Sequence, residues 1–96
     1  MENIKWLEGW YLNNCDGYWE HCYGIKIATL DNPGWSIKID LRETNYVNAK
    51  FIRQMQDLSD EDWFCCFFED GIFNGVGDPH KLDMIIQIFR EWIESL

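Results

Sequence analysis

The eight residues WSIKIDLR, residues 35–42, constrain the fold more than any other stretch of this sequence. Apolar and polar side chains alternate at every position. A period of two places each kind on its own face of an extended strand, whereas a helix repeats every 3.6 residues or so. The stretch therefore predicts a half-buried strand. Its predicted buried face carries Trp35, Ile37, Ile39 and Leu41, and its opposite face carries Ser36, Lys38 and Asp40.

The residues before this strand predict a partner for it. In residues 23–30, the side chains of Tyr23, Ile25 and Ile27 share one face of a second alternating stretch. The intervening residues 31–34, Asp-Asn-Pro-Gly, form a turn sequence, because Pro fixes φ and Gly accepts a positive φ. We expect the two strands to form an antiparallel hairpin.

Three more strands are expected further along the chain. One runs near residues 50–56, and residues 63–69 pair with residues 72–76 across Asp70-Gly71, a favoured tight-turn dipeptide. The run WFCCFF, residues 63–68, places apolar side chains on both faces of its strand. This pattern favours a central strand covered on both sides. The alternative leaves one face exposed as an interaction patch.

Two helices are expected at the ends of the chain. In residues 3–14, apolar side chains recur at spacings of three and four. A second helix is predicted to start at Asp78-Pro79, because Asp can cap free N–H groups and Pro suits the first helical position. Its apolar stripe consists of Leu82, Ile85, Ile86, Phe89, Ile93 and Leu96. The predicted fold class is α+β: an antiparallel sheet of about five strands with an N-terminal and a C-terminal helix packed on it.

The length and composition favour a single domain. The chain has 96 residues, 47% of them hydrophobic, which supplies one core, so we expect residues 1–96 to form one unit. The first residues, MENIKWLEGW, lack the apolar run of a signal peptide. The longest apolar run is WFCCFF, whereas a helix needs roughly 20 apolar residues to span a bilayer. A cytoplasmic protein without a membrane segment is expected.

The charge of the chain restricts its partners. A formal charge of −9 argues against nucleic acid, because affinity for phosphates depends on Lys and Arg, and it also disfavours anionic membranes. Residues 54–80 contain seven acids and no Lys or Arg. These acids form either solvated loops that keep the protein soluble or a negative patch that attracts a basic partner.

The segment CDGYWEHCYG, residues 15–24, offers two thiols and an imidazole as candidates for catalysis or metal binding. The spacing of Cys15 and Cys22 does not fit a zinc knuckle, and the adjacent Cys65 and Cys66 would point to opposite faces of a strand. We therefore expect no metal and no cofactor. The alternative function is a small cytoplasmic enzyme or thiol-dependent regulator that uses His21 with Cys15 or Cys22.

The run CDGYWEHCYGIKIATLDNPGWSIKIDL, residues 15–41, resembles the signature of the immunity protein 53 family of bacterial polymorphic toxin systems. The preceding WLEGWYLNN continues the resemblance. The resemblance implies a small protein, encoded beside a toxin, that binds the toxin and blocks its activity without a cofactor or a reaction. The signature positions, which have no assigned role, are Cys15, Asp16, Gly17, Trp19, Glu20, His21, Tyr23, Gly24, Asp31, Asn32, Pro33, Gly34 and Trp35.

The acidic segment supplies the candidate toxin-binding residues. If the cognate toxin has a basic active-site surface, we expect acids of this segment to face it, with an aromatic neighbour as the desolvated centre. These candidates are Asp60, Glu61, Asp62, Trp63, Glu69 and Asp70. If the acids instead lie in a solvated loop away from the partner, the signature residues around Trp19 and Glu20 become the candidate toxin-binding surface.

Overall fold

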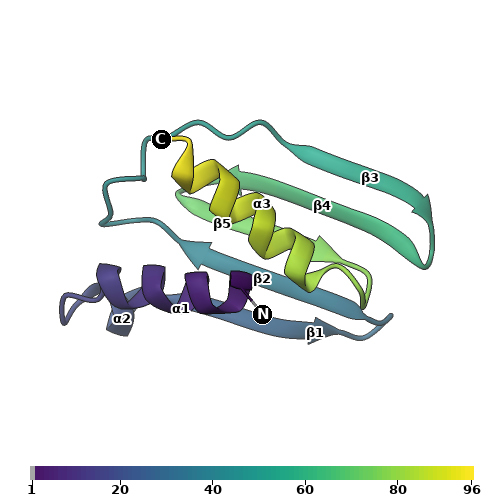
Figure 1. The fold of residues 1–96 in the computed structure, drawn as a ribbon, viewed down its shortest axis with the longest axis horizontal. Helices are drawn as coiled ribbons and strands as arrows, with labels where there is room; N and C mark the ends of the chain where they lie inside the picture. The colour runs from purple at the N-terminus through teal and green to yellow at the C-terminus, as the bar shows by residue number, and fades with distance from the viewer. Residues whose placement is uncertain (1) are drawn as a thin grey trace.

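The computed structural model describes residues 2–96 as one antiparallel sheet of five strands with a helix at each end of the chain (Figure 1). The elements are α1 (Glu2–Asn14), α2 (Trp19–Cys22), β1 (Ile25–Leu30), β2 (Gly34–Asp40), β3 (Gln54–Ser59), β4 (Asp62–Glu69), β5 (Ile72–Gly77) and α3 (Leu82–Glu94). The predicted α+β fold class is confirmed. In the described part of the chain, no helix is both long enough and apolar enough to cross a membrane.

The strands lie in the order β1-β2-β5-β4-β3, and each neighbouring pair is antiparallel. Both predicted hairpins are present. β1 pairs with β2, and β4 pairs with β5 across Asp70 and Gly71, which both adopt a positive φ. After β2 the chain crosses to the far edge of the sheet, where it forms β3 (Figure 1). β5 therefore lies between β2 and β4, although it is the last strand in the sequence.

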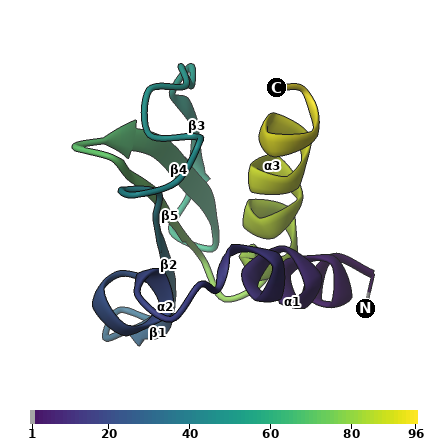
Figure 2. The same ribbon diagram turned by 90° about the vertical axis from the view of Figure 1, so that its left-hand side faces the viewer.

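The two long helices lie on the same side of the sheet (Figure 2). α3 packs on β2 and β5, and α1 packs against α3. The apolar face of the alternating stretch lies beneath these helices, where Ile37, Ile39 and Leu41 are fully buried and Trp35 is half-buried. The predicted burial is confirmed for Ile37, Ile39 and Leu41, whereas Trp35, near the end of the strand, is only half-buried.

An aromatic cluster joins the two helices to the sheet. The ring of Phe89 in α3 is fully buried and lies 5.0 Å from the rings of both Trp10 in α1 and Phe73 in β5. Gly75 in β5 allows α3 to approach the sheet, because a Cβ atom at that position would collide with the side chain of Ile85. The core is therefore a single layer of side chains between one helical layer and one sheet face.

The opposite face of the sheet, which we call the open face, carries no covering element within residues 2–96 (Figure 2). On β4, Cys66 points to the helices and is fully buried, whereas Trp63, Cys65 and Phe67 point to the open face and are half-buried. The prediction that residues 63–68 form a strand covered on both sides is therefore wrong. Both helices pack on one face, so the alternative with one exposed face is observed.

Two strand boundaries differ from the prediction. β3 begins at Gln54 rather than near Lys50, because residues 50–53 run past α3, where the indole Nε1 of Trp92 donates a hydrogen bond to the carbonyl of Lys50 at 2.9 Å. β1 begins at Ile25, because Tyr23 still ends the short helix α2 and donates its backbone N–H to the carbonyl of Trp19.

The start of the C-terminal helix also differs. α3 begins at Leu82, and its N-cap position is Lys81, so the predicted start at Asp78-Pro79 is wrong. The carboxylate of Asp78 does not cap the helix. It accepts hydrogen bonds from the backbone N–H groups of His80 at 2.8 Å and Trp63 at 2.9 Å, and thereby fixes the connection between β5 and α3 to the start of β4.

Candidate functional site

The segment of residues 15–24 forms a corner that leads from α1 through α2 to β1. Asp16 Oδ1 accepts hydrogen bonds from the backbone N–H groups of Tyr18 and Trp19, both at 2.9 Å. Glu20 returns toward the same turn and accepts from the N–H groups of Asp16 at 2.9 Å and Gly17 at 2.7 Å. Hydrogen bonds from the N–H groups of Trp19 and Tyr18 lower the pKa of Asp16. These two signature carboxylates therefore hold the backbone of the corner.

Other signature positions also have structural roles. Trp19 is fully buried, and its Nε1 donates to the carbonyl of Asp40 at 2.8 Å, which joins the corner to the end of β2. Trp35 Nε1 donates to the carbonyl of Pro79 at 3.0 Å. Gly34 lies against the backbone of Gly77, where a side chain would collide with the carbonyl oxygen. Much of the signature therefore specifies the fold.

The thiols do not form a catalytic arrangement with His21. His21 and Cys22 are both exposed on α2, and within residues 2–96 no hydrogen bond joins His21 to a thiol. Cys15 instead donates its Sγ–H to the carbonyl of Tyr11 at 3.2 Å. Burial raises the pKa of Cys66 to about 12, which makes this thiol unreactive. Among the described residues, no three His, Cys, Asp or Glu side chains are grouped as metal ligands.

The structure separates the predicted acidic residues into two groups. Asp60, Glu61 and Asp62 lie at the turn between β3 and β4, whereas Glu69 and Asp70 lie at the other end of β4. The strand rises about 3.3 Å per residue, so its two ends are about 23 Å apart. The six candidate residues therefore do not form one compact cluster, although both groups border the open face.

One group is joined by residues from elsewhere in the chain. The turn between β3 and β4 meets the signature turn between β1 and β2 at one end of the molecule (Figure 1). A hollow of about 400 Å³ lies between them. It is lined by Asn32, Asp57, Ser59, Asp60 and Trp63. We call this region, together with the exposed Asp31 and Glu61, the acidic end.

The acidic end contains residues that were not among the candidates from the acidic segment. Asp57 lies in β3, directly opposite Trp63 in β4, so both side chains face the open side of the sheet. Asn32 belongs to the signature turn. Both residues were visible in the sequence, but nothing in their local pattern indicates that the strand order brings them together. Among residues 2–96, no ion pair involves Asp57, Asp60 or Glu61.

Two further acids near this end have structural partners. The ammonium group of Lys81 lies 2.6 Å from Asp78 Oδ2 and 2.7 Å from Asp62 Oδ1. The hydrogen bond from Lys81, with those from the backbone N–H groups of His80 and Trp63, lowers the pKa of Asp78 to about 2. Asp62 is consequently less available to a partner than Asp60 or Glu61.

The open face beside the acidic end is partly apolar. Its middle row consists of side chains paired across four strands, namely Ser36, Val76, Cys65 and Met55. Val76 and Cys65 are half-buried, whereas Met55 is 65% exposed. The next row contains Phe67, whose ring lies 5.4 Å from the Arg53 guanidinium carbon. The face therefore combines apolar side chains on β3, β4 and β5 with the exposed Lys38 on β2 and with the acids at its two ends.

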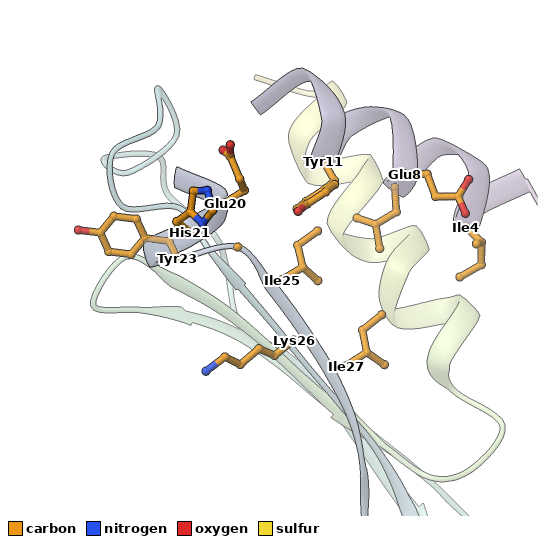
Figure 3. A pocket seen from close by; sticks show the side chains of 11 residues that line it. Ile4, Glu8, Tyr11, Glu20, His21, Tyr23, Ile25, Lys26 and Ile27 are labelled. Atoms are coloured by element: carbon orange, nitrogen blue, oxygen red, sulfur yellow. The ribbon is translucent and has the colours of Figure 1, made fainter. Parts of the chain in front are cut away.

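A second hollow, of about 600 Å³, lies between α1 and β1 at the opposite edge of the sheet from β3. We call it the α1–β1 hollow. Figure 3 shows Tyr11 pointing from α1 toward β1, and Ile25 and Ile27 pointing from β1 toward α1. Two signature residues, Glu20 and His21, lie at one end of the hollow.

These features define a small α+β protein whose distinctive surfaces are a partly apolar open face, an acidic end and the α1–β1 hollow, a combination suited to binding another protein. The family model of immunity protein 53 matches residues 4–94, nearly the whole chain. The chain belongs to the immunity protein 53 family, as its signature predicted. This match supports an immunity function and suggests a protein that is not an enzyme. Neither the curated proteins nor the solved structures contain a match.

Proposed function

We propose that this protein binds the toxin encoded beside its own gene and neutralises it as a stoichiometric inhibitor in the bacterial cytoplasm. The observation that carries this proposal is the family match, which covers residues 4–94 and so reaches from the first turn of α1 to the end of α3. The family implies a toxin as partner. Inhibition by binding requires no cofactor and no reaction, so it needs only a complementary surface.

The acidic end is the proposed centre of the toxin-binding surface. The carboxylates of Asp57, Asp60 and Glu61 form no ion pair among the described residues, and Asp57 and Asp60 line the same hollow as the half-buried ring of Trp63. A partner with a basic surface would complement these charges. Trp63 would supply the apolar contact that is desolvated on binding, because aromatic side chains dominate the energetic centres of interfaces.

Glu69 and Asp70 fit the same proposal as a distal part of the interface. A standard interface buries roughly 800 Å² on each partner, which corresponds to a patch almost 30 Å across. That width exceeds the separation of about 23 Å between the two ends of β4. A toxin that covers the open face would therefore reach both acidic groups, with Cys65 and Phe67 between them.

The proposal is tested with the product of the neighbouring toxin gene. The toxin and this protein are co-expressed and purified, and the mass and subunit ratio of the complex are measured by light scattering. We expect a stable complex with a fixed ratio and survival of cells that express both proteins. The absence of a complex between the two purified, folded proteins would refute the proposed function.

A further inference from the structure

The outer edge of β1 presents unpaired backbone groups. The N–H of Asp40 donates to the carbonyl of Gly24 at 3.1 Å, which fixes the phase of the hydrogen bonds between β1 and β2. Because these bonds alternate along an antiparallel pair, the N–H and C=O groups of Ile25, Ile27 and Thr29 point away from β2. Within residues 2–96 no further strand lies on this side, because β1 is an edge strand.

The side chains next to this edge are also incompletely covered. Ile27 pairs with Ile37 and shares its helix-facing side, yet Ile27 is 43% exposed whereas Ile37 is fully buried. The difference arises because the α1–β1 hollow separates the helix from the edge of the sheet (Figure 3). A strand added beside β1 would direct every second side chain into this hollow, toward Ile4 and Tyr11.

β1 lacks most of the devices that normally block pairing at a sheet edge. Those devices are proline, bulges, very short strands, charges that point inward and charged side chains on the edge, Lys above all; of these β1 has only Lys26. β1 has six consecutive pairs with β2, and its sequence IKIATL contains no proline. Its one charged side chain, Lys26, points away from Ile25 and Ile27 in Figure 3. The other edge strand, β3, has a register shift between Asp57 and Ser59. Of the two edge strands, β1 is therefore better suited than β3 to pair with an additional strand.

We propose that an extended segment of the toxin adds to the sheet as a sixth strand beside β1. Its backbone would pair with Ile25, Ile27 and Thr29, and its alternate apolar side chains would enter the α1–β1 hollow. This inference rests on the proposed function, because it takes the toxin as the partner. The outer edge of β1 ends at the signature turn, where Asp31 and Asn32 begin the acidic end. The β1 edge and the acidic end are therefore adjacent, and one toxin could contact both.

Charge favours a partner segment over a second copy of this chain. Each copy carries a formal charge of −9, so two copies repel each other. The hollow is lined by Glu8 and Glu20 and also by Lys26, whose ammonium group is directed to the other face in Figure 3. Glu8 has one exposed ion pair, with Lys5 at 3.8 Å. Basic residues beside the apolar positions of the toxin segment would therefore be attracted to this edge.

Amide hydrogen exchange, followed residue by residue by NMR, tests the added strand directly. In the free protein, the amides of Ile25, Ile27 and Thr29 should exchange rapidly, whereas those of Lys26 and Ala28 are protected by β2. Adding the purified toxin should slow exchange of the three outward amides by about tenfold or more. If the complex forms without protection of these amides, the added strand is refuted and the proposed function stands. If raising the concentration of the protein alone protects them, the occupant is a second copy and the proposal is wrong.

A matched set of variants gives an independent readout. Thr29→Pro removes one outward N–H and places the proline ring at the edge, whereas Thr29→Val keeps the N–H. We expect Thr29→Pro to weaken toxin binding by about tenfold or more and Thr29→Val to change it less than about threefold. Ala28→Pro, which removes an N–H bonded to β2, should instead lower the melting temperature. Equal toxin affinities for the two Thr29 variants, each shown to be folded, would overturn the proposal.

Discussion

Reversing charge at the acidic end tests whether this region steers the toxin. Replacing Asp57, Asp60 and Glu61 by Lys changes the formal charge of the protein by six units, from −9 to −3. Asp62 is left unchanged, because its contact with Lys81 is part of the fold. The control variant has the same charge change at the opposite end of the molecule. It replaces the exposed acids Glu43, Glu91 and Glu94 by Lys; because Glu94 thereby loses its contact with Arg90 and Glu91 its contact with Gln87, the control is first shown to be folded.

The expected magnitude follows from the positions of the charges at the surface. Two unit charges about 7 Å apart in water interact by about 0.6 kcal/mol. Reversing one charge replaces an attraction of about 0.6 kcal/mol by an equal repulsion, so the interaction energy changes by about 1.2 kcal/mol per site. Three sites together change it by about 3.6 kcal/mol, which corresponds to about 400-fold in the association rate without salt. The Debye length is about 30 Å at 10 mM salt and about 8 Å at 150 mM salt. Screening therefore reduces the expected change to about 100-fold at 10 mM salt and about tenfold at 150 mM salt.

Stopped-flow mixing with the purified toxin measures these association rates across a range of salt concentrations. The acidic-end variant should associate more slowly, and its rate should depend less on salt than that of the original protein. The control variant should lose much less at 150 mM salt, because Glu91 and Glu94 lie on α3, away from the open face, and Glu43 follows the end of β2 that is farther from the acidic end than the Debye length. Equal losses in the two variants would show that total charge, rather than the acidic end, governs association. An unchanged rate in a folded acidic-end variant would exclude this end from the encounter.

Three further predictions concern the core, the pH dependence and the thiols. Phe89→Ala removes a fully buried ring, so it should lower the free energy of unfolding by about 3–5 kcal/mol and the melting temperature by about 15–25 °C; a loss below about 1 kcal/mol would place Phe89 outside the core. The lowered pKa of Asp78, about 2, contributes stability above the ordinary carboxyl pKa that is lost as the pH falls toward 2. Denaturant unfolding of the Asp78→Asn variant should therefore show a smaller loss of stability between about pH 4 and pH 2; an unchanged loss would assign it to other carboxylates. Replacing Cys15 and Cys22 by Ser should leave the affinity for the toxin within about twofold of the original value. If a folded variant no longer allows cells that express the toxin to survive, the thiol-dependent alternative is favoured.

Local sequence patterns predicted most of the secondary structure. The alternation around Ile37 and Ile39 specified a strand and its buried face, because neighbouring side chains on a strand point to opposite sides. The spacing of Ile85, Ile86 and Phe89 specified the buried face of α3 for the corresponding reason. These features depend on residues that are close in sequence, so the sequence contains the whole signal.

Strand order could not be read from local patterns. The apolar run of residues 63–68 favoured a strand covered on both faces, but whether the second face is covered depends on the side of the sheet on which both helices pack. Asn32 and Asp60 meet because β2 is followed by a crossover to the far edge of the sheet. Such contacts between distant segments depend on loop closure and packing, which no periodicity records.

The structural roles of the signature limit where partner recognition can lie. Trp19 is fully buried and bonded to the end of β2, and Glu20 bonds the backbone of the corner, so changing either would act on binding through the structure of the corner. Asp31 and Asn32 are exposed signature residues, and the side chain of neither has a hydrogen-bonding partner among residues 2–96. They lie where the edge of β1 ends and the acidic end begins. A toxin bound along that path would contact this turn, and the signature would then serve both the fold and the interface.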